Sequence, residues 1–246
     1  MTPVSVAVII VAAGTGTRLG AGMPKALVEV AGRTILEHSL TTALAVRDLG
    51  EVVVVAPGSH LDAVSELVDR QRPAVPVTVV AGGADRTASV ASGLAALGDA
   101  LERDDAAPAE PEQVVLVHDA ARCFTPVEVF DRVADAVRDG WVAVVPGLPV
   151  VDTVKVVDAR GVVQSTPARE ALRAVQTPQG FLRSELEAAH AGGTSATDDA
   201  ALLEALGHRV LVVDGDPAAF KVTLPADLDR AHRHHADLVR TPQETV

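Results

Sequence analysis

Short valine-rich apolar runs alternate along the chain with segments in which leucine, valine and alanine recur at helical spacing. The runs predict buried strands, and the segments with a period near 3.6 residues predict helices. Strands are expected at residues 4–12, 51–56, 77–81, 114–118, 142–146 and 209–213. Helices are expected at residues 35–49, 61–72, 87–101, 127–139 and 227–239. This order predicts an α/β fold with a Rossmann-like, mostly parallel sheet and helices on both faces.

Residues 149–176 interrupt this order. Two short alternating runs, 153–157 and 161–165, flank the turn Asp158-Ala159-Arg160, which is the pattern of a β-hairpin. Two strands alone are marginally stable in water, so we expect an arm that packs on another surface, most economically the same arm of a second chain. The alternative is that the hairpin folds back on its own domain. Because no composition shift marks a boundary, residues 1–246 are predicted to form a single domain that carries this arm.

Composition narrows the choice of partners. The 246 residues are 48% hydrophobic, enough for a sizeable core, and carry a formal charge of −12 with 2% aromatic residues. An acidic chain with few aromatic platforms is not expected to bind nucleic acid or an anionic membrane. The single cysteine, Cys123, excludes an intrachain disulfide and fits a reducing compartment. The apolar N-terminus lacks the basic region of a signal peptide, so we expect a buried strand and a cytoplasmic protein.

A glycine-rich loop, AAGTGTRLGAGMPKAL, follows the first predicted strand at residues 12–27. Its glycines allow positive φ and close approach of backbone N–H groups to an anion, and Arg18 and Lys25 add two cations. The spacing misses the dinucleotide fingerprint by one residue and lacks the GK[ST] of a P-loop. An ordinary strand-to-helix turn is the alternative, but it would not need both cations. The loop therefore predicts a site for a triphosphate.

Polar residues also follow two other predicted strands, at the edge where open α/β sheets bind ligands. Residues 82–90, GGADRTASV, combine two glycines with Ser89, which either caps a helix or reads a base edge. Residues 118–122, HDAAR, place Asp119 and Arg122 just past a strand, as an ion pair or as ligand contacts. Farther along, the Asp198-Asp199 pair is typical of the first turn of a helix, which Thr197 would cap.

Seven motifs occur in the order and approximate spacing of one enzyme family: AAGTGTRLGAGMPKAL, GGADRTASV, HDAAR, DTVK, TPQGF, TDDAALLE and FKVT. Over nearly its whole length the chain resembles the 2-C-methyl-D-erythritol 4-phosphate cytidylyltransferases of the non-mevalonate isoprenoid pathway. The resemblance implies transfer of CMP from CTP to methylerythritol phosphate. Relatives that use ribitol 5-phosphate or another polyol phosphate are the nearest alternative, and a non-catalytic nucleotide-binding protein is a more distant one.

The resemblance also implies residue roles. The nucleotide would be contacted by Ala12, Ala13, Gly14, Gly16, Gly83, Arg86, Ser89, Asp119 and Ala120. The methylerythritol phosphate pocket would lie across a homodimer interface and combine Asp119, Arg122, Thr153, Arg169, Thr177, Thr197 and Lys221. Mg²⁺ would sit mainly on the CTP phosphates, so no residue is expected to be a dedicated metal ligand. Two departures from the family pattern, Cys123 in place of proline and Ala84 in place of an acidic residue, concern substrate fit rather than reaction type.

The chemistry fits these residue types. A phosphate monoester has a second pKa of about 6, so at pH 7 it can attack the α-phosphorus of CTP without a general base. The site must then supply alignment and positive charge for the transition state and the departing pyrophosphate. Arg18, Lys25 and Lys221 are the residues assigned to this catalytic role.

Overall fold

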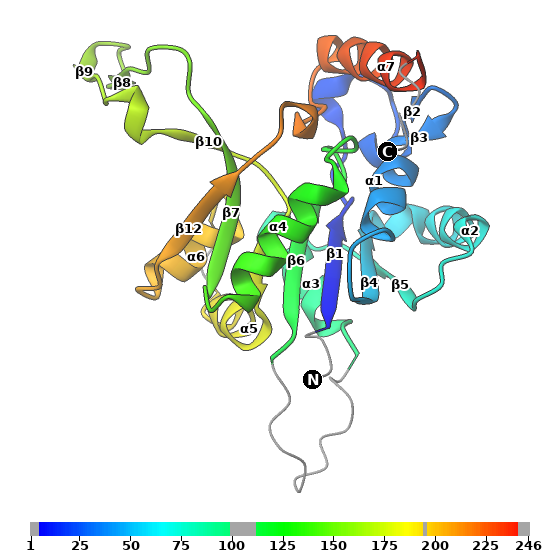
Figure 1. Ribbon diagram of the computed structural model, residues 1–246. Helices are drawn as coiled ribbons and strands as arrows, with labels where there is room; N and C mark the ends of the chain where they lie inside the picture. The colour runs from blue at the N-terminus through cyan, green and yellow to red at the C-terminus, as the bar shows by residue number, and fades with distance from the viewer. Residues whose placement is uncertain (1–4, 99–111, 194–195, 241–246) are drawn as a thin grey trace, which may run out of the picture.

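The computed structural model describes residues 5–98, 112–193 and 196–240, and most of this part is built around one eight-stranded sheet (Figure 1). The strand order is β10-β7-β11-β6-β1-β4-β5, and β12 also pairs with β7. The strands are β1 (Val6–Val11), β4 (Leu49–Ala56), β5 (Val77–Ala81), β6 (Val114–Asp119), β7 (Ala143–Pro149), β10 (Arg173–Val175), β11 (Gln179–Leu182) and β12 (Val210–Asp214). Two short two-stranded sheets, β2 (Glu29–Val30) with β3 (Arg33–Thr34) and β8 (Val156–Val157) with β9 (Val163–Ser165), complete the strands of this part.

Helices cover both faces of the sheet, as predicted. The helices are α1 (Ile35–Ala43), α2 (Leu61–Gln71), α3 (Arg86–Ala95), α4 (Val127–Arg138), α5 (Arg183–Ala191), α6 (Asp199–Ala205) and α7 (Pro225–Arg240). Alternate residues of β1 point to opposite faces: Val8 and Ile10 join a core with α1, α2 and α4, while Ala7 and Ile9 join one with α3, α5 and α6. A strand buried on both faces must be apolar throughout, which explains the unbroken run that predicted it.

All six predicted strands are present, with ends that differ by a few residues, but the predicted sheet was incomplete. Strands β1, β4, β5 and β6 are parallel to one another, and β12 is parallel to β7. The short strand β11 lies antiparallel between β6 and β7, and β10 pairs antiparallel with the end of β7. Neither was predicted, because runs of three or four residues carry too little periodicity.

The helix predicted at 35–49 was too long. Helix α1 ends at Ala43, a turn follows in which Asp48 has a φ of 56°, and β4 begins at Leu49. Helix α3 likewise stops at Ala95, and the last predicted residues of that helix lie outside the described part. The polar, proline-containing stretch at 104–113 predicts a surface loop, and all but its last two residues also lie outside that part. Helix α5 was not predicted, and of α6 only the first turn, at the Asp198-Asp199 pair, was expected.

The hairpin is present as an antiparallel pair of β8 and β9. The Asp158 side chain closes its turn by accepting hydrogen bonds from the backbone N–H groups of Arg160 and Val162, each at 2.9 Å. Figure 1 shows the hairpin projecting from the end of β7, away from the sheet and from α7. We call this segment, residues 149–176, the arm.

The carboxyl ends of β1, β4, β5 and β6 lie at the same edge of the sheet, because these strands are parallel. Helix α7 packs beside this edge through a small core that includes Leu19 of the glycine-rich loop, Cys123 after β6 and Val222 before α7 (Figure 1). This core ties together three chain segments that the sequence predicted to carry site residues.

Candidate active site

The glycine-rich loop is folded around its own lysine. Gly16 has a φ of 70° and precedes a 3₁₀ turn, Thr17–Leu19, and Gly20 ends that turn with the same φ. A Cβ atom on Gly16 would lie 2.8 Å from the Cβ of Lys25 and 2.9 Å from its backbone nitrogen. Only glycine therefore allows both the left-handed backbone and this close approach. Ala12 and Leu19 are buried, whereas Gly14 and Arg18 are exposed.

Lys25 begins a second 3₁₀ turn, Lys25–Leu27, and lies among other cations. Partial burial, together with repulsion from Lys221, Arg18 and Arg122, lowers its pKa to about 8, while Asp119 acts in the opposite direction. Lys221, Arg18 and Arg122 thus lie close enough to Lys25 to act on its charge, in a chain whose formal charge is −12. Such a concentration of positive charge is costly unless an anionic ligand occupies the site.

The second loop lies against the first. A Cβ atom on Gly82 would overlap the side chain of Ala13, so the two loops are in close contact. The Gly83 backbone N–H donates to the Ser89 hydroxyl at 3.1 Å, and that hydroxyl donates to the Asp85 carbonyl at 2.7 Å. The capping role considered for Ser89 is wrong: Asp85 caps α3, and Ser89 lies inside the helix, where it holds the loop.

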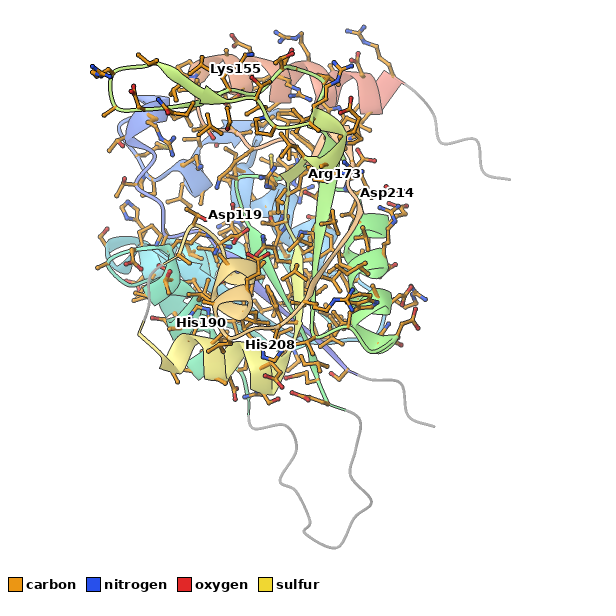
Figure 2. All side chains as sticks on the ribbon, turned by 90° about the vertical axis from the view of Figure 1, so that its left-hand side faces the viewer. Asp119, Lys155, Arg173, His190, His208 and Asp214 are labelled. Carbon is orange, nitrogen blue, oxygen red and sulfur yellow. The ribbon has the colours of Figure 1, made fainter. Side chains whose placement is uncertain are left out.

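Asp119, at the end of β6, is the hub of the site (Figure 2). Its carboxylate pairs with Lys221 Nζ at 2.6 Å and Arg86 Nε at 3.3 Å, and its backbone N–H donates to the Thr177 hydroxyl at 3.0 Å. Burial alone would raise its pKa, but the charges of Arg86 and Lys221 outweigh burial and hold it well below the usual range. Asp119 is therefore a carboxylate near neutral pH.

Thr177 and His118 support this hub from inside the sheet. The Thr177 hydroxyl is buried and lies 3.1 Å from Nδ1 of His118. Burial lowers the pKa of His118 to about 3, so its ring is neutral near pH 7. These contacts connect the Thr177 side chain to β6 within the same chain.

The ion pair that we considered between Asp119 and Arg122 is not formed. Arg122 instead donates to the carbonyl oxygens of Ala219 at 2.8 Å and Val175 at 3.2 Å, and burial lowers its pKa. Its buried Nε atom has no hydrogen-bond partner within the described residues. The guanidinium therefore bridges the segment before Lys221 and the end of β10.

Not all predicted residues meet at this edge. Ala12 and Ala120 lie at it, but their N–H groups donate to strand carbonyls, to Val55 at 2.8 Å and to Val11 at 3.1 Å. Thr153 and Arg169 are exposed on the arm, where Arg169 donates to the Val151 carbonyl at 3.1 Å. Figure 2 shows Lys155, also on the arm, well separated from Asp119.

Thr197 is exposed just before α6, and it is not the cap of that helix. Asp198 caps α6 by accepting from the Ala201 backbone N–H at 3.0 Å. The next residue, Asp199, is buried and reaches Arg86. The sequence suggested only a helix start at the Asp198-Asp199 pair, and no local signal could have shown which carboxylate points inward.

Among the described residues, no group of three or more histidine, cysteine, aspartate or glutamate side chains is arranged to hold a metal ion. No helix in that same part is long and apolar enough to cross a membrane.

A mixed α/β sheet with a glycine-rich loop and a cluster of cations at its carboxyl edge places the protein in the class of α/β nucleotidyltransferases. Residues 6–235 match the sequence profile of the family described as IspD: 2-C-methyl-D-erythritol 4-phosphate cytidylyltransferase. The chain belongs to this family, which confirms the resemblance drawn from its motifs.

Individual relatives agree with this assignment. The chain is 47% identical over 224 residues to the 2-C-methyl-D-erythritol 4-phosphate cytidylyltransferase of Nocardia farcinica, with 91% of each chain covered. It is 52% identical over 227 residues to the bifunctional enzyme IspD/IspF of Clavibacter michiganensis subsp. michiganensis, where the match covers 91% of this chain but 53% of that protein. The chain thus spans about half the length of that bifunctional relative.

Solved structures show the same fold. The 4-diphosphocytidyl-2C-methyl-D-erythritol synthase of Anaerococcus prevotii superposes with a TM-score of 0.78 at 28% identity, covering 95% of this chain and 99% of that one. The 2-C-methyl-D-erythritol 4-phosphate cytidylyltransferase of Thermus thermophilus superposes with a TM-score of 0.70 at 37% identity, covering 96% and 100%.

Proposed function

We propose that this protein transfers CMP from CTP to 2-C-methyl-D-erythritol 4-phosphate, with 4-diphosphocytidyl-2-C-methyl-D-erythritol and pyrophosphate as products. The observation that carries this proposal is the gathering of Lys221, Arg18 and Arg122 around the partly buried Lys25, whose pKa is lowered to about 8 by burial and by these cations together. A triphosphate and an attacking phosphate together provide the negative charge that such a cluster requires.

The reaction needs alignment and charge rather than a proton acceptor. A phosphate oxygen of the substrate attacks the α-phosphorus, a new P–O bond forms, and the bond to the β-phosphate oxygen breaks as pyrophosphate leaves. Arg18 and Lys25 are proposed to hold the triphosphate, and Lys221 to stabilise negative charge near the α-phosphate. Asp119 holds Lys221 at 2.6 Å and thereby sets the position of its ammonium group.

Around the base, Ala13, Gly14 and Gly16 are proposed to contact the nucleotide together with Gly83. The contact of the two loops at Gly82 and Ala13 supports this, since it brings both glycine-rich segments to one place. Ser89 is proposed to act through the Gly83 backbone, which it binds at 3.1 Å.

Mg²⁺ is proposed to enter on the nucleotide. Asp119, the carboxylate at the centre of the site, is already paired with two cations, Arg86 and Lys221, and this donor set does not suit a dedicated metal site. The site is instead suited to a Mg²⁺ ion whose ligands are the CTP phosphates and water. When bound in this way, Mg²⁺ supplies neutralisation of phosphate charge.

The homodimer is likewise a proposal, and it concerns the arm. Exposed valines concentrate there: Val151 is 78% exposed, Val157 52% and Val163 51%. Apolar side chains on a projecting hairpin favour contact with a second copy of the chain. Thr153 and Arg169 would then be placed in the partner's site, where Arg122, Thr177, Thr197 and Lys221 are proposed to complete the pocket.

Pyrophosphate release tests the reaction. Each nucleoside triphosphate is supplied with either methylerythritol phosphate or ribitol 5-phosphate, and the product is identified by mass. We expect release with CTP and methylerythritol phosphate. Release with ribitol 5-phosphate only would replace the proposed substrate, and no release with any pair would favour a nucleotide-binding protein.

Mixing two inactive variants tests the shared site. Arg169→Ala alters the arm and Lys25→Ala alters the loop, so a heterodimer of the two contains one site in which both residues are intact. Equal mixing should restore about a quarter of the wild-type activity, because half of the dimers are mixed and each has one intact site. No recovery in a mixture shown to exchange subunits would place Arg169 and Lys25 in the same chain's site.

The remaining expectations stay predictions. We propose that residues 1–246 form one cytidylyltransferase domain with the arm as a subregion, that the protein acts in the cytoplasm, and that it does not bind nucleic acid or membranes.

A further inference from the structure

Asp199 is a buried carboxylate that none of the roles above uses. Its side chain is 1% exposed, and its two oxygens face two different partners. Oδ1 lies 3.1 Å from Nε2 of His190 on α5, and Oδ2 lies 2.7 Å from Nη1 of Arg86 on α3. A carboxylate that is removed from water in this way is stabilised only while both partners remain in place.

Arg86 extends this contact to the hub of the site. Its Nε donates to Asp119 at 3.3 Å, and the second oxygen of Asp119 accepts from Lys221 at 2.6 Å. A continuous series of side-chain contacts thus leads from His190 on α5, through Asp199, Arg86 and Asp119, to Lys221, the lysine proposed to act on the α-phosphate. Figure 2 shows His190 at one end of this row and Asp119 nearer the arm.

The position of Asp199 is itself fixed by the sheet. Gln179 of β11 is fully buried, and its amide donates to Asp198 at 2.9 Å while its carbonyl oxygen accepts from the Ala200 backbone N–H at 3.3 Å. These two bonds hold the residues on either side of Asp199. The carboxylate therefore has little freedom to follow Arg86 if that side chain moves.

We propose that Asp199, braced by His190, is a positioning residue for cytidylyl transfer, which orients Arg86 and through it Asp119 and Lys221. Two carboxylates share the Arg86 guanidinium, so neither neutralises it alone. Without the Asp199 charge, Arg86 would pair with Asp119 only and draw that carboxylate away from Lys221. The ammonium group would lose its fixed position relative to the α-phosphate. This inference rests on the proposed function.

The primary test is Asp199→Asn, which keeps the shape of the side chain and removes its charge. The matched control is Glu187→Gln, which breaks the exposed Arg183–Glu187 pair on α5, formed at 2.7 Å. We expect kcat of Asp199→Asn to fall by about tenfold to a hundredfold, the range for small misplacements of a catalytic group. KM for CTP should change by less than about threefold, because Arg18 and Lys25 are untouched. The control should stay within about twofold of wild type.

A double-mutant cycle separates positioning from general stability. Arg86→Gln leaves Asp199 buried without its cation, so adding Asp199→Asn should raise the unfolding midpoint above that of Arg86→Gln alone. If Asp199 acts through Arg86, the double variant should have the same kcat as Arg86→Gln. Equal further losses of kcat in both backgrounds would overturn the proposal.

If Asp199→Asn does not fold, His190→Leu is tested in its place, since it removes the His190–Asp199 contact but leaves the Arg86–Asp199 pair. We expect its kcat to fall by about threefold or more, with KM for CTP unchanged. An active wild-type protein whose Asp199 and His190 variants match the Glu187→Gln control would contradict the positioning role alone. A wild-type protein that releases no pyrophosphate would contradict the proposed function itself.

Discussion

The pKa of Lys25 leads to a specific pH dependence. Burial and neighbouring cations lower this pKa from 10.5 to about 8, so the ammonium group loses its proton as the pH rises through 8. Roughly nine-tenths of the free enzyme carries the proton at pH 7 and roughly a tenth at pH 9, by the ordinary titration curve. If the charged form binds CTP productively, kcat/KM for CTP should fall about tenfold between these values.

The assay is pyrophosphate release at low CTP concentration from pH 6.5 to 10, with circular dichroism at each pH to show that the fold is intact. The control is Lys25→Arg, whose guanidinium stays charged over this range. Its profile should be flat above pH 7, at a lower level, because a planar fork replaces a point charge. A flat wild-type profile, or the same descending limb in Lys25→Arg, would refute the assignment of this limb to Lys25.

The same pKa shift has a consequence for stability. The folded-state pKa of Lys25 lies below its unfolded value of 10.5, so the protonated lysine opposes folding in the empty site. This unfavourable contribution is fully present below about pH 8 and is relieved as the pH rises toward 10.5. An excess of CTP should remove it, because bound phosphates stabilise the charged form.

Three further predictions concern single residues. Lys221→Ala should lower kcat about a hundredfold, or roughly 3 kcal/mol of transition-state stabilisation, with little loss of fold; near-normal turnover would contradict its role. Gly16→Ala should lower the free energy of unfolding by about 1–2 kcal/mol because of its positive φ, and it should also impair catalysis by displacing Lys25. Gly20→Ala has the same φ but open space around it, so in denaturant titrations it should lower the free energy of unfolding without displacing Lys25. Thr177→Val should cost about 1–3 kcal/mol in thermal unfolding, since a buried backbone N–H loses its acceptor; an unchanged midpoint would refute the importance of that bond.

The class of fold was predictable because its strongest signals are local. Each buried parallel strand, such as β1 or β4, must be apolar on both faces, and the helices between strands carry a regular apolar stripe. The short antiparallel strand β11 carries no such signal. Its place is set by pairing with β6 and β7, residues far away in the sequence.

The site was predictable only in part. The glycine-rich loop can be recognised in the sequence, because positive φ and close backbone approach restrict residue types within one segment. The partners of Asp119 come from α3 and from the segment before α7, which lie 33 and 102 positions away. Residue types alone suggested Arg122 as its ion-pair partner, but the folded chain turns that guanidinium toward backbone carbonyls.

The sequence by itself determined the alternating α/β order, the glycine-rich loop that contains Arg18 and Lys25, the hairpin of the arm and, through its motifs, the family. These features depend on local conformation and on residue types that occur together within short segments. The tertiary structure alone decided how the charges are paired: Asp119 between Arg86 and Lys221, and Asp199 behind Arg86. Such pairing depends on which strand ends and helix starts become neighbours when the sheet forms, and because those segments are distant in the chain, no local pattern records it.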